Sequence, residues 1–145
     1  MDKRQITLRS GKQIPAIRVR RLLRRNQWKV YLKEEDIRWY LNHAYRVITA
    51  WKGKVLVGLA VLIGDGRTYL ELETLLVDKA YRRIGIGTRL MEAVMDRVVQ
   101  VKPYAVKIEV FDKKAERFYG RFGFVVNRNT WLLERNTTAH MRTTW

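Results

Sequence analysis

Residues 77–90 read Val-Asp-Lys-Ala-Tyr-Arg-Arg-Ile-Gly-Ile-Gly-Thr-Arg-Leu, and this stretch decides how the chain is expected to fold. An apolar run ends at Val77, and the glycines Gly85 and Gly87 come just before apolar residues at helical spacing. The first N–H groups of a helix lack backbone partners, and its macrodipole is positive at that end. Because glycines let an anion approach the backbone, we expect residues 82–88 to bind phosphate.

Two common phosphate-binding loops do not fit the spacing. A P-loop requires Gly-Lys-Ser/Thr after its glycines, whereas Thr88 and Arg89 follow here. A dinucleotide-binding loop requires a third small residue where this chain has Leu90, and Glu109 is the sole acidic residue near the position expected for ribose binding. The sequence therefore excludes both readings.

The segment resembles the acyl-CoA loop of the Gcn5-related N-acetyltransferases (GNAT), written Arg/Gln-x-x-Gly-x-Gly/Ala. Here the loop is Arg82-Arg83-Ile84-Gly85-Ile86-Gly87, preceded by Val77-Asp78. A second block, residues 106–124, is similar to the family's strand, its Asn-x-x-Ala-x-x-x-Tyr motif and its Gly-Phe pair. The matching residues are Asp112, Ala115, Tyr119, Gly123 and Phe124. The resemblance covers residues 16–135.

The resemblance implies a single α/β domain with a mixed sheet, in which the two central parallel strands splay apart and helices flank the sheet. We expect a basic N-terminal arm over residues 1–15, the GNAT domain over 16–135 and a polar tail over 136–145. The parallel pair is expected at 68–77 and 105–110, with the pantetheine arm of the cofactor in the wedge between them.

Local patterns give the remaining elements. Residues 1–13 form an arm or a short added strand, Ala16–Leu22 alternates weakly and predicts the first strand, and 24–32 is a short helix and loop. Further helices are expected at 33–44, 85–100 and 113–122, the last capped by Asp112. Further strands are expected at 45–51, 54–63, 124–126 and 130–135, the first two as a hairpin turning at Lys52-Gly53.

The resemblance also implies a cofactor, acetyl-CoA, and a set of residues that bind it. Backbone N–H groups of the loop would hold the diphosphate, and Val77 would direct its N–H toward the acetyl carbonyl. Asp112 stands where the family has an asparagine that contacts pantetheine, and a carboxylate can only accept hydrogen bonds there. The implied cofactor-binding residues are Val77, Arg82, Arg83, Ile84, Gly85, Ile86, Gly87, Thr88, Asp112 and Ala115.

Three residues are candidates for the catalytic chemistry. Tyr119 matches the family's tyrosine that protonates the departing thiolate; its alternative role is aromatic packing. Glu71 and Glu73 lie two residues apart on one face of the expected central strand, where either could deprotonate the acceptor amine. Alternatively, both carboxylates pair with nearby basic side chains. Because unpaired burial of a carboxylate is costly, we expect them to line the cleft.

The acidic residues Glu34, Glu35 and Asp36 open the expected helix at 33–44. The resemblance places this region at the wall of the acceptor pocket, where Glu34 and Glu35 could attract an amine. The same residues would also complement the helix macrodipole, which favours negative charge in the first turn.

The chain has 145 residues and a formal net charge of +16. Residues 1–29 contain ten basic residues and one acidic residue, with the densest group at Arg18, Arg20, Arg21, Arg24 and Arg25. Long-range attraction of CoA is one explanation of this charge. The other is docking of RNA or another polyanion on Arg20, Arg21, Arg24 and Arg25, since phosphate contacts dominate nucleic-acid affinity.

Other features of the composition narrow the classes of protein. There is no cysteine, which excludes disulfides and thiolate metal sites, and two histidines are too few for a zinc site. No apolar run approaches 18 residues and there is no signal-peptide pattern, which predicts a cytoplasmic protein without a membrane partner. A homodimer is common in the family, but no residue pattern requires one.

The sequence therefore predicts an N-acetyltransferase that transfers acetyl from acetyl-CoA to a primary amine by direct attack in a ternary complex. An alternative keeps the chemistry but places the amine on an aminoacyl-tRNA or a nucleic-acid-associated basic protein, docked by the arginine-rich N-terminal region. A third interpretation, from a different class, is a nucleic-acid-binding module without turnover.

Overall fold

A computed structural model describes residues 5–110, 112–127 and 132–136 of the chain. Its centre is a seven-stranded mixed sheet in the order β1-β2-β3-β4-β5-β7-β6. The strands are β1 (Ile6–Ser10), β2 (Arg46–Lys52), β3 (Val55–Gly64), β4 (Leu70–Val77), β5 (Ala105–Glu109), β6 (Val125–Asn127) and β7 (Leu132–Asn136). Among the described strands, only β4 and β5 pair in parallel, and every other neighbouring pair is antiparallel.

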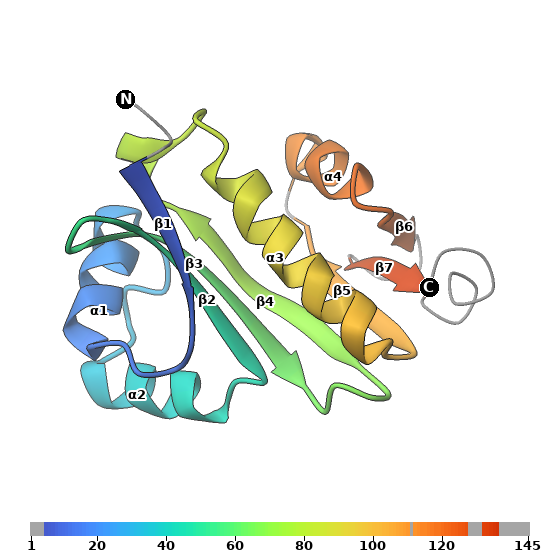
Figure 1. The fold of residues 1–145 in the computed structure, drawn as a ribbon, viewed down its shortest axis with the longest axis horizontal. Coiled ribbons are helices and arrows are strands. Elements are labelled where there is room, and N and C mark those ends of the chain that lie inside the picture. Colours follow the sequence, from blue (N-terminus) through green and yellow to red (C-terminus); the bar gives the residue numbers. More distant parts are fainter. Residues whose placement is uncertain (1–4, 111, 128–131, 137–145) are drawn as a thin grey trace.

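Helices cover both faces of the sheet (Figure 1). α3 (Ile86–Val101) packs on one face, while α1 (Ala16–Arg25) and α2 (Glu34–His43) cover the other, and α4 (Lys113–Gly120) follows β5. Each face has its own apolar core: Leu90, Met91 and Val94 of α3 belong to one, and Leu22 of α1 and Ile37 of α2 to the other. The predicted α/β fold with a mixed sheet is confirmed.

The strand predicted at Ala16–Leu22 is wrong, because this segment forms the first seven of the ten residues of α1. The buried residues are Ala16, Val19, Leu22 and Leu23, which follow the spacing of a helix. Ile17, which suggested alternation together with Val19, is exposed. The arginines between these positions form the polar face of an amphipathic helix.

Most other elements fall where the sequence predicted them. α2 and the β2–β3 hairpin match, and Gly53 lies in the hairpin turn with a φ of 57°, which favours glycine. The N-terminal segment contributes β1, which pairs with β2 at the sheet edge. Of the predicted tail over 136–145, only Asn136 lies within the described residues, at the end of β7. Thr130 of the predicted last strand lies outside them.

β4 and β5 separate along their length. Their parallel register joins Leu70 to Val106, Glu71 to Lys107 and Leu72 to Ile108, and the described pairing ends there although β4 continues to Val77. The pairing of the two parallel strands thus ends partway along β4, as the predicted splay requires. The carboxyl-terminal half of β4 keeps β3 as its partner on one side only.

A β-bulge in β4 lies next to this separation. Thr74 opposes Val61 of β3 while Leu72 opposes Leu62, which leaves Glu73 without an opposite residue. Such a bulge changes the face to which the following side chains point. Leu70 and Leu72 accordingly pack in the α3 core, whereas Leu76 packs in the core beneath α1 and α2.

α3 approaches the sheet closely at Gly58 of β3. A Cβ atom there would lie 3.1 Å from Leu90 Cδ1 and 3.2 Å from Ile86 Cγ2. These contacts are tighter than ordinary packing allows, so glycine is what lets the start of α3 rest on β3. Within the described residues, none of the helices combines the length and apolarity needed to cross a bilayer.

Candidate functional site

The chain from β4 to α3 forms the loop that the sequence singled out. Asp78 caps the short 3-10 helix η2 (Lys79–Tyr81) through a hydrogen bond from the Ala80 N–H. Gly85 then precedes α3 with a φ of 87°, a left-handed conformation that favours glycine. The first intrahelical bond of α3 runs from the Arg89 N–H to the Gly85 carbonyl. The N–H groups of residues 86–88 lie before it and face the helix end, where an anion is favoured.

A cavity of about 330 Å³ opens at this helix end. It is lined by Leu75, Val77, Arg82, Arg83, Gly85, Ile86, Gly87, Thr88 and Phe118. A Cβ atom on Gly87 would lie 3.7 Å from both Phe118 Cζ and Val77 Cγ2, so even one added carbon would occupy the narrow space between strand and helix. The glycine loop, the end of β4 and α4 therefore meet around one opening.

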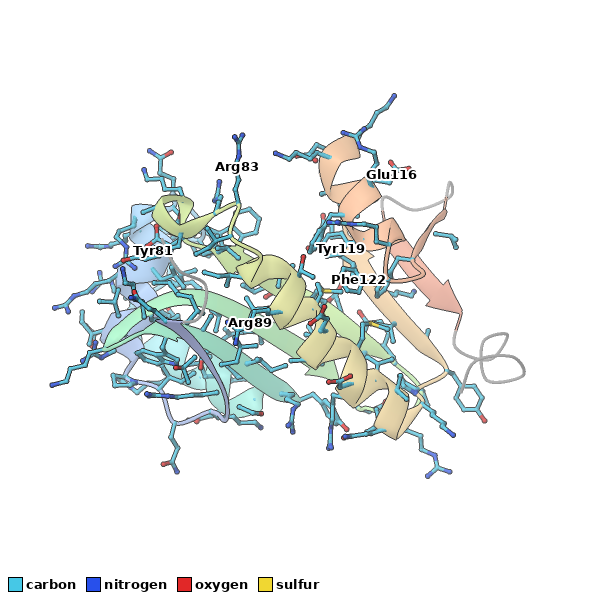
Figure 2. All side chains as sticks on the ribbon, turned by 45° about the horizontal axis from the view of Figure 1, so that its top comes forward. Tyr81, Arg83, Arg89, Glu116, Tyr119 and Phe122 are labelled. Atoms are coloured by element: carbon cyan, nitrogen blue, oxygen red, sulfur yellow. The ribbon has the colours of Figure 1, made fainter. Side chains whose placement is uncertain are left out.

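The two loop arginines differ in direction. Arg82 turns back and its Nε donates to the Val77 carbonyl at 3.0 Å, which fixes the turn after β4. Arg83 is exposed and projects outward from the loop before α3 (Figure 2). Ile84 packs against the α3 core as a partly buried side chain. Arg83 is thus the loop cation with the freest approach to a bound polyanion.

Backbone N–H groups of β4 point into the gap left by β5. The Asp78 N–H donates to the Val57 carbonyl at 2.8 Å, so it points toward β3. Because successive N–H groups of a strand alternate in direction, the N–H groups of Val77 and Leu75 point the opposite way, toward β5. Leu75 was not among the sequence candidates, since the direction of its N–H follows from the pairing of β4 with β3.

Tyr119 lies on the inward side of α4 and is only 9% exposed (Figure 2). Its ring makes edge contacts with Phe118 and Phe124 and belongs to the α3 core. Burial raises the pKa of Tyr119 to about 12, so its hydroxyl stays protonated at neutral pH. Tyr119 also lines a second opening of about 740 Å³ along α4, which shares Phe118 with the first.

Asp112 and Ala115 begin α4. The Asp112 carboxylate accepts a hydrogen bond from the Ala115 N–H at 2.7 Å, as predicted for an N-cap. Both residues line the opening along α4. Since this bond engages one oxygen of the carboxylate, Asp112 has a structural role at the helix start besides any contact with a cofactor.

Glu71 and Glu73 have different surroundings. The Glu73 carboxylate accepts hydrogen bonds from Lys29 and Tyr40, and from the Thr74 hydroxyl at 2.8 Å. Burial, and next the bond to Glu73, raise the pKa of Tyr40 far above its usual value. Glu71 interacts with the hydroxyl of Tyr69, whose pKa rises to about 12, mainly through burial. The alternative interpretation, in which the glutamates pair with nearby basic side chains, holds for Glu73 through its ion pair with Lys29.

A third cavity, of about 310 Å³, lies beside Glu73 on the sheet face that α2 covers. Its lining residues are Lys29, Tyr31, Leu32, Asp36, Trp39, Tyr40 and Glu73. Glu34 and Glu35 were the residues that the sequence suggested for attracting the substrate amine. Glu34 forms ion pairs with Arg20 at 3.9 Å and with Arg38 at 3.8 Å, and Glu35 is exposed. Neither is among the lining residues. Asp36 does line the cavity, and its carboxylate also accepts a hydrogen bond from the Lys33 N–H at the start of α2.

Three of the five clustered arginines of α1 contact other parts of the fold. Arg18 donates to the Lys54 carbonyl, and Arg20 faces Glu34. Arg25 donates to Asp78 at 2.8 Å, a carboxylate that is only 3% exposed. This ion pair ties the end of α1 to the segment that enters the glycine loop. Arg21 and Arg24 are exposed and remain candidates for a polyanion contact.

No grouping of histidine or acidic side chains suited to a metal ion occurs among the residues that the structure describes. The site therefore consists of a glycine loop at a helix start, a strand with N–H groups directed into a gap, a buried tyrosine hydroxyl and a carboxylate-lined cavity on the opposite face of the sheet.

Comparison with known proteins identifies relatives of this arrangement. A family model described as an acetyltransferase (GNAT) domain matches residues 10–144. A GNAT family acetyltransferase from Streptococcus pneumoniae TIGR4 is 27% identical over 83% of this chain and 88% of that one, with a TM-score of 0.73. No curated protein matches the chain.

Two further solved structures share the fold at lower identity. Ard1 from Thermoplasma volcanium is 20% identical over 90% of this chain and 97% of its own, with a TM-score of 0.74. A GNAT family acetyltransferase from Elizabethkingia anophelis with acetyl-CoA bound is 18% identical over 92% of this chain and 99% of its own, with a TM-score of 0.66. The resemblance seen in residues 77–90 and 106–124 is confirmed.

Proposed function

The chain belongs to the GNAT family of acetyltransferases, and on that premise we propose that it transfers an acetyl group from acetyl-CoA to a primary amine by direct attack within a ternary complex. The observation that carries this proposal is the separation of β4 from β5 beside the cavity at the start of α3. A slender chain with a phosphate at one end fits such a gap.

The residues around the gap fit the cofactor. The N–H groups at residues 86–88 would hold the diphosphate, Arg83 would add positive charge, and Gly87 leaves the room that a side chain would fill. Bound acetyl-CoA supplies the activated acetyl group. Leu75 and Val77 would orient its carbonyl, because N–H donors fixed in a strand stabilise negative charge without reorganising.

The remaining roles fall to Tyr119 and the two glutamates. Tyr119 lines the opening along α4, which shares Phe118 with the cavity at the start of α3, and its protonated hydroxyl would donate its proton to the departing thiolate. Glu71 and Glu73 lie on the sheet face beside the third cavity, where a carboxylate can hold an ammonium and accept its proton. Glu73 is the better placed to bind, because it lines the cavity, while Glu71 remains the second candidate base.

Calorimetric titration with acetyl-CoA at moderate salt tests the cofactor assignment, with ATP as a polyanion control. We expect a micromolar dissociation constant for acetyl-CoA and binding of ATP at least tenfold weaker, because ATP shares the charge but not the pantetheine arm. If ATP binds as tightly as acetyl-CoA, the loop attracts phosphate through charge alone and the proposal is wrong.

A second candidate acceptor is an amine attached to RNA or to a nucleic-acid-associated protein. The observation that favours it is the exposure of Arg21 and Arg24 on one side of α1 in a chain of net charge +16. We expect replacement of both by alanine to weaken tRNA binding about tenfold at low salt and to lower its salt dependence. The matched control is Lys12→Ala with Lys54→Ala, which removes the same charge elsewhere. Equal losses in the two double variants would contradict docking on α1.

A further inference from the structure

The cavity beside Glu73 differs in character from the rest of this basic protein. It brings together three aromatic rings, from Tyr31, Trp39 and Tyr40, and two carboxylates, from Asp36 and Glu73, with the single cation Lys29. Tyr31 is 75% exposed and Trp39 is 63% exposed, although large aromatic side chains are usually buried. Exposed rings around a carboxylate are the chemistry with which proteins bind organic cations.

Lys29 already places a primary ammonium group in this cavity. Its Nζ donates to the Glu73 carboxylate, lies 3.5 Å from the Thr74 hydroxyl and sits 5.2 Å from the centroid of the Tyr40 ring. The Tyr40 hydroxyl donates to the same carboxylate and so holds it in place. A carboxylate, a hydroxyl and a ring face are the partners that an alkylammonium requires when it leaves water.

The position of this group relative to β4 matters for acetyl transfer. Glu73 is two residues before Leu75, which corresponds to at most about 7 Å along the strand because the bulge at Glu73 shortens it. The Leu75 N–H points into the gap proposed for the cofactor. An ammonium bound on Glu73 is therefore close to the place where an amine would have to react.

We propose that the acceptor is a small primary alkylamine with an unbranched apolar stem, which binds as its ammonium form on Glu73 in place of Lys29. Its stem lies against Tyr31 and Trp39, and Asp36 adds to the attraction for a cation. Lys29 acts as a built-in competitor that an acceptor must displace. This inference rests on the proposed function, because it names the acceptor class for the same reaction.

Binding can be measured without turnover by following the indole N–H resonance of Trp39 during titration with n-butylammonium chloride at constant ionic strength. The resonance is identified by its loss in Trp39→Phe. We expect Lys29→Met to tighten binding at least about threefold, since it removes the competing ammonium but keeps the stem. Glu73→Gln should weaken binding about tenfold or more, because it removes the charge on which the ammonium rests.

Two controls separate this site from general charge effects. Lys33→Met removes one exposed positive charge nearby and preserves the backbone N–H that Asp36 accepts, so its affinity should match the unmodified chain. Butan-1-ol has the same stem without the charge and should bind more weakly to the unmodified chain than butylammonium does. Should Glu73→Gln fail to fold, Lys29→Met and the butanol comparison still decide.

The inference is overturned if Lys29→Met weakens binding or leaves it unchanged, if Glu73→Gln binds as the unmodified chain does, or if butanol matches butylammonium. Acetyl-CoA titration of the same samples distinguishes the two proposals. Acetyl-CoA binding without butylammonium binding refutes the acceptor class alone. Butylammonium binding without acetyl-CoA binding supports the cation site and refutes the proposed function.

Discussion

Replacing Gly87 with glutamate should weaken acetyl-CoA binding at least about a hundredfold while the fold is retained, a loss of about 2.8 kcal/mol in binding free energy. The reason is geometric as well as electrostatic. A Cβ at this position would fit at 3.7 Å from Phe118 and Val77, but the rest of the side chain would have to extend into the cavity at the start of α3. There its carboxylate would repel the diphosphate of the cofactor.

The fold should tolerate this change because Gly87 lies in the first turn of α3. A negative side chain there complements the helix macrodipole, and glutamate has a higher helix propensity than glycine. Gly87→Ala is the matched control: we expect unchanged or slightly higher thermal stability and a smaller loss of acetyl-CoA affinity. Calorimetry measures binding and thermal unfolding measures stability. If Gly87→Glu binds acetyl-CoA within tenfold of the unmodified chain, the cofactor does not lie at this helix start.

The parts of the fold that the sequence predicted well are those defined by local chemistry. The glycines at 85 and 87 determine where the loop ends and α3 begins, and Asp112 caps α4 by bonding a residue three positions away. The splay of β4 from β5 came from the family resemblance, because no short pattern in either strand determines where their pairing ends. A motif whose contacts join residues only a few positions apart can be interpreted without the rest of the chain.

The first predicted strand shows where local reasoning fails. Ile17 and Val19 alternate over too short a stretch to distinguish a strand from a helix. The decisive residues are Leu22 and Leu23, which extend the helical spacing and pack in the core beneath α1 and α2. A window that ends at Leu22 misses Leu23, the last of the four buried residues of this apolar face.

The surroundings of Glu73 could not be predicted because their contacts join distant parts of the chain. Glu73 meets Lys29 and Tyr40, which lie 44 and 33 positions earlier. The bulge that leaves Glu73 without a strand partner is set by pairing with β3 and has no signal in the sequence of β4 itself. The partners of Arg20 and Arg25 are likewise distant, so the sequence could not show which arginines the fold already uses.

Replacing Tyr119 with phenylalanine should lower the turnover number at least about tenfold, equivalent to about 1.4 kcal/mol in the barrier, with little change in acetyl-CoA affinity. The substitution removes a hydroxyl and keeps the ring that contacts Phe118 and Phe124, so the core should remain packed. With its pKa raised to about 12, the hydroxyl holds its proton throughout the usual assay range. The proton is therefore available, but the group is a weak acid compared with a thiol of pKa about 8.5.

That weakness decides how Tyr119 can act. Transfer of a proton from a phenol to a free thiolate is unfavourable, so the hydroxyl contributes by standing next to the sulfur as negative charge develops there. A packing role alone predicts a different result: turnover and thermal stability would both stay unchanged, because phenylalanine keeps the ring contacts with Phe118 and Phe124. Measuring turnover number, acetyl-CoA affinity and thermal unfolding on the same sample separates these cases, with Tyr104→Phe as a control at an exposed tyrosine. If the turnover number of Tyr119→Phe is unchanged, Tyr119 is not the acid that protonates the departing thiolate.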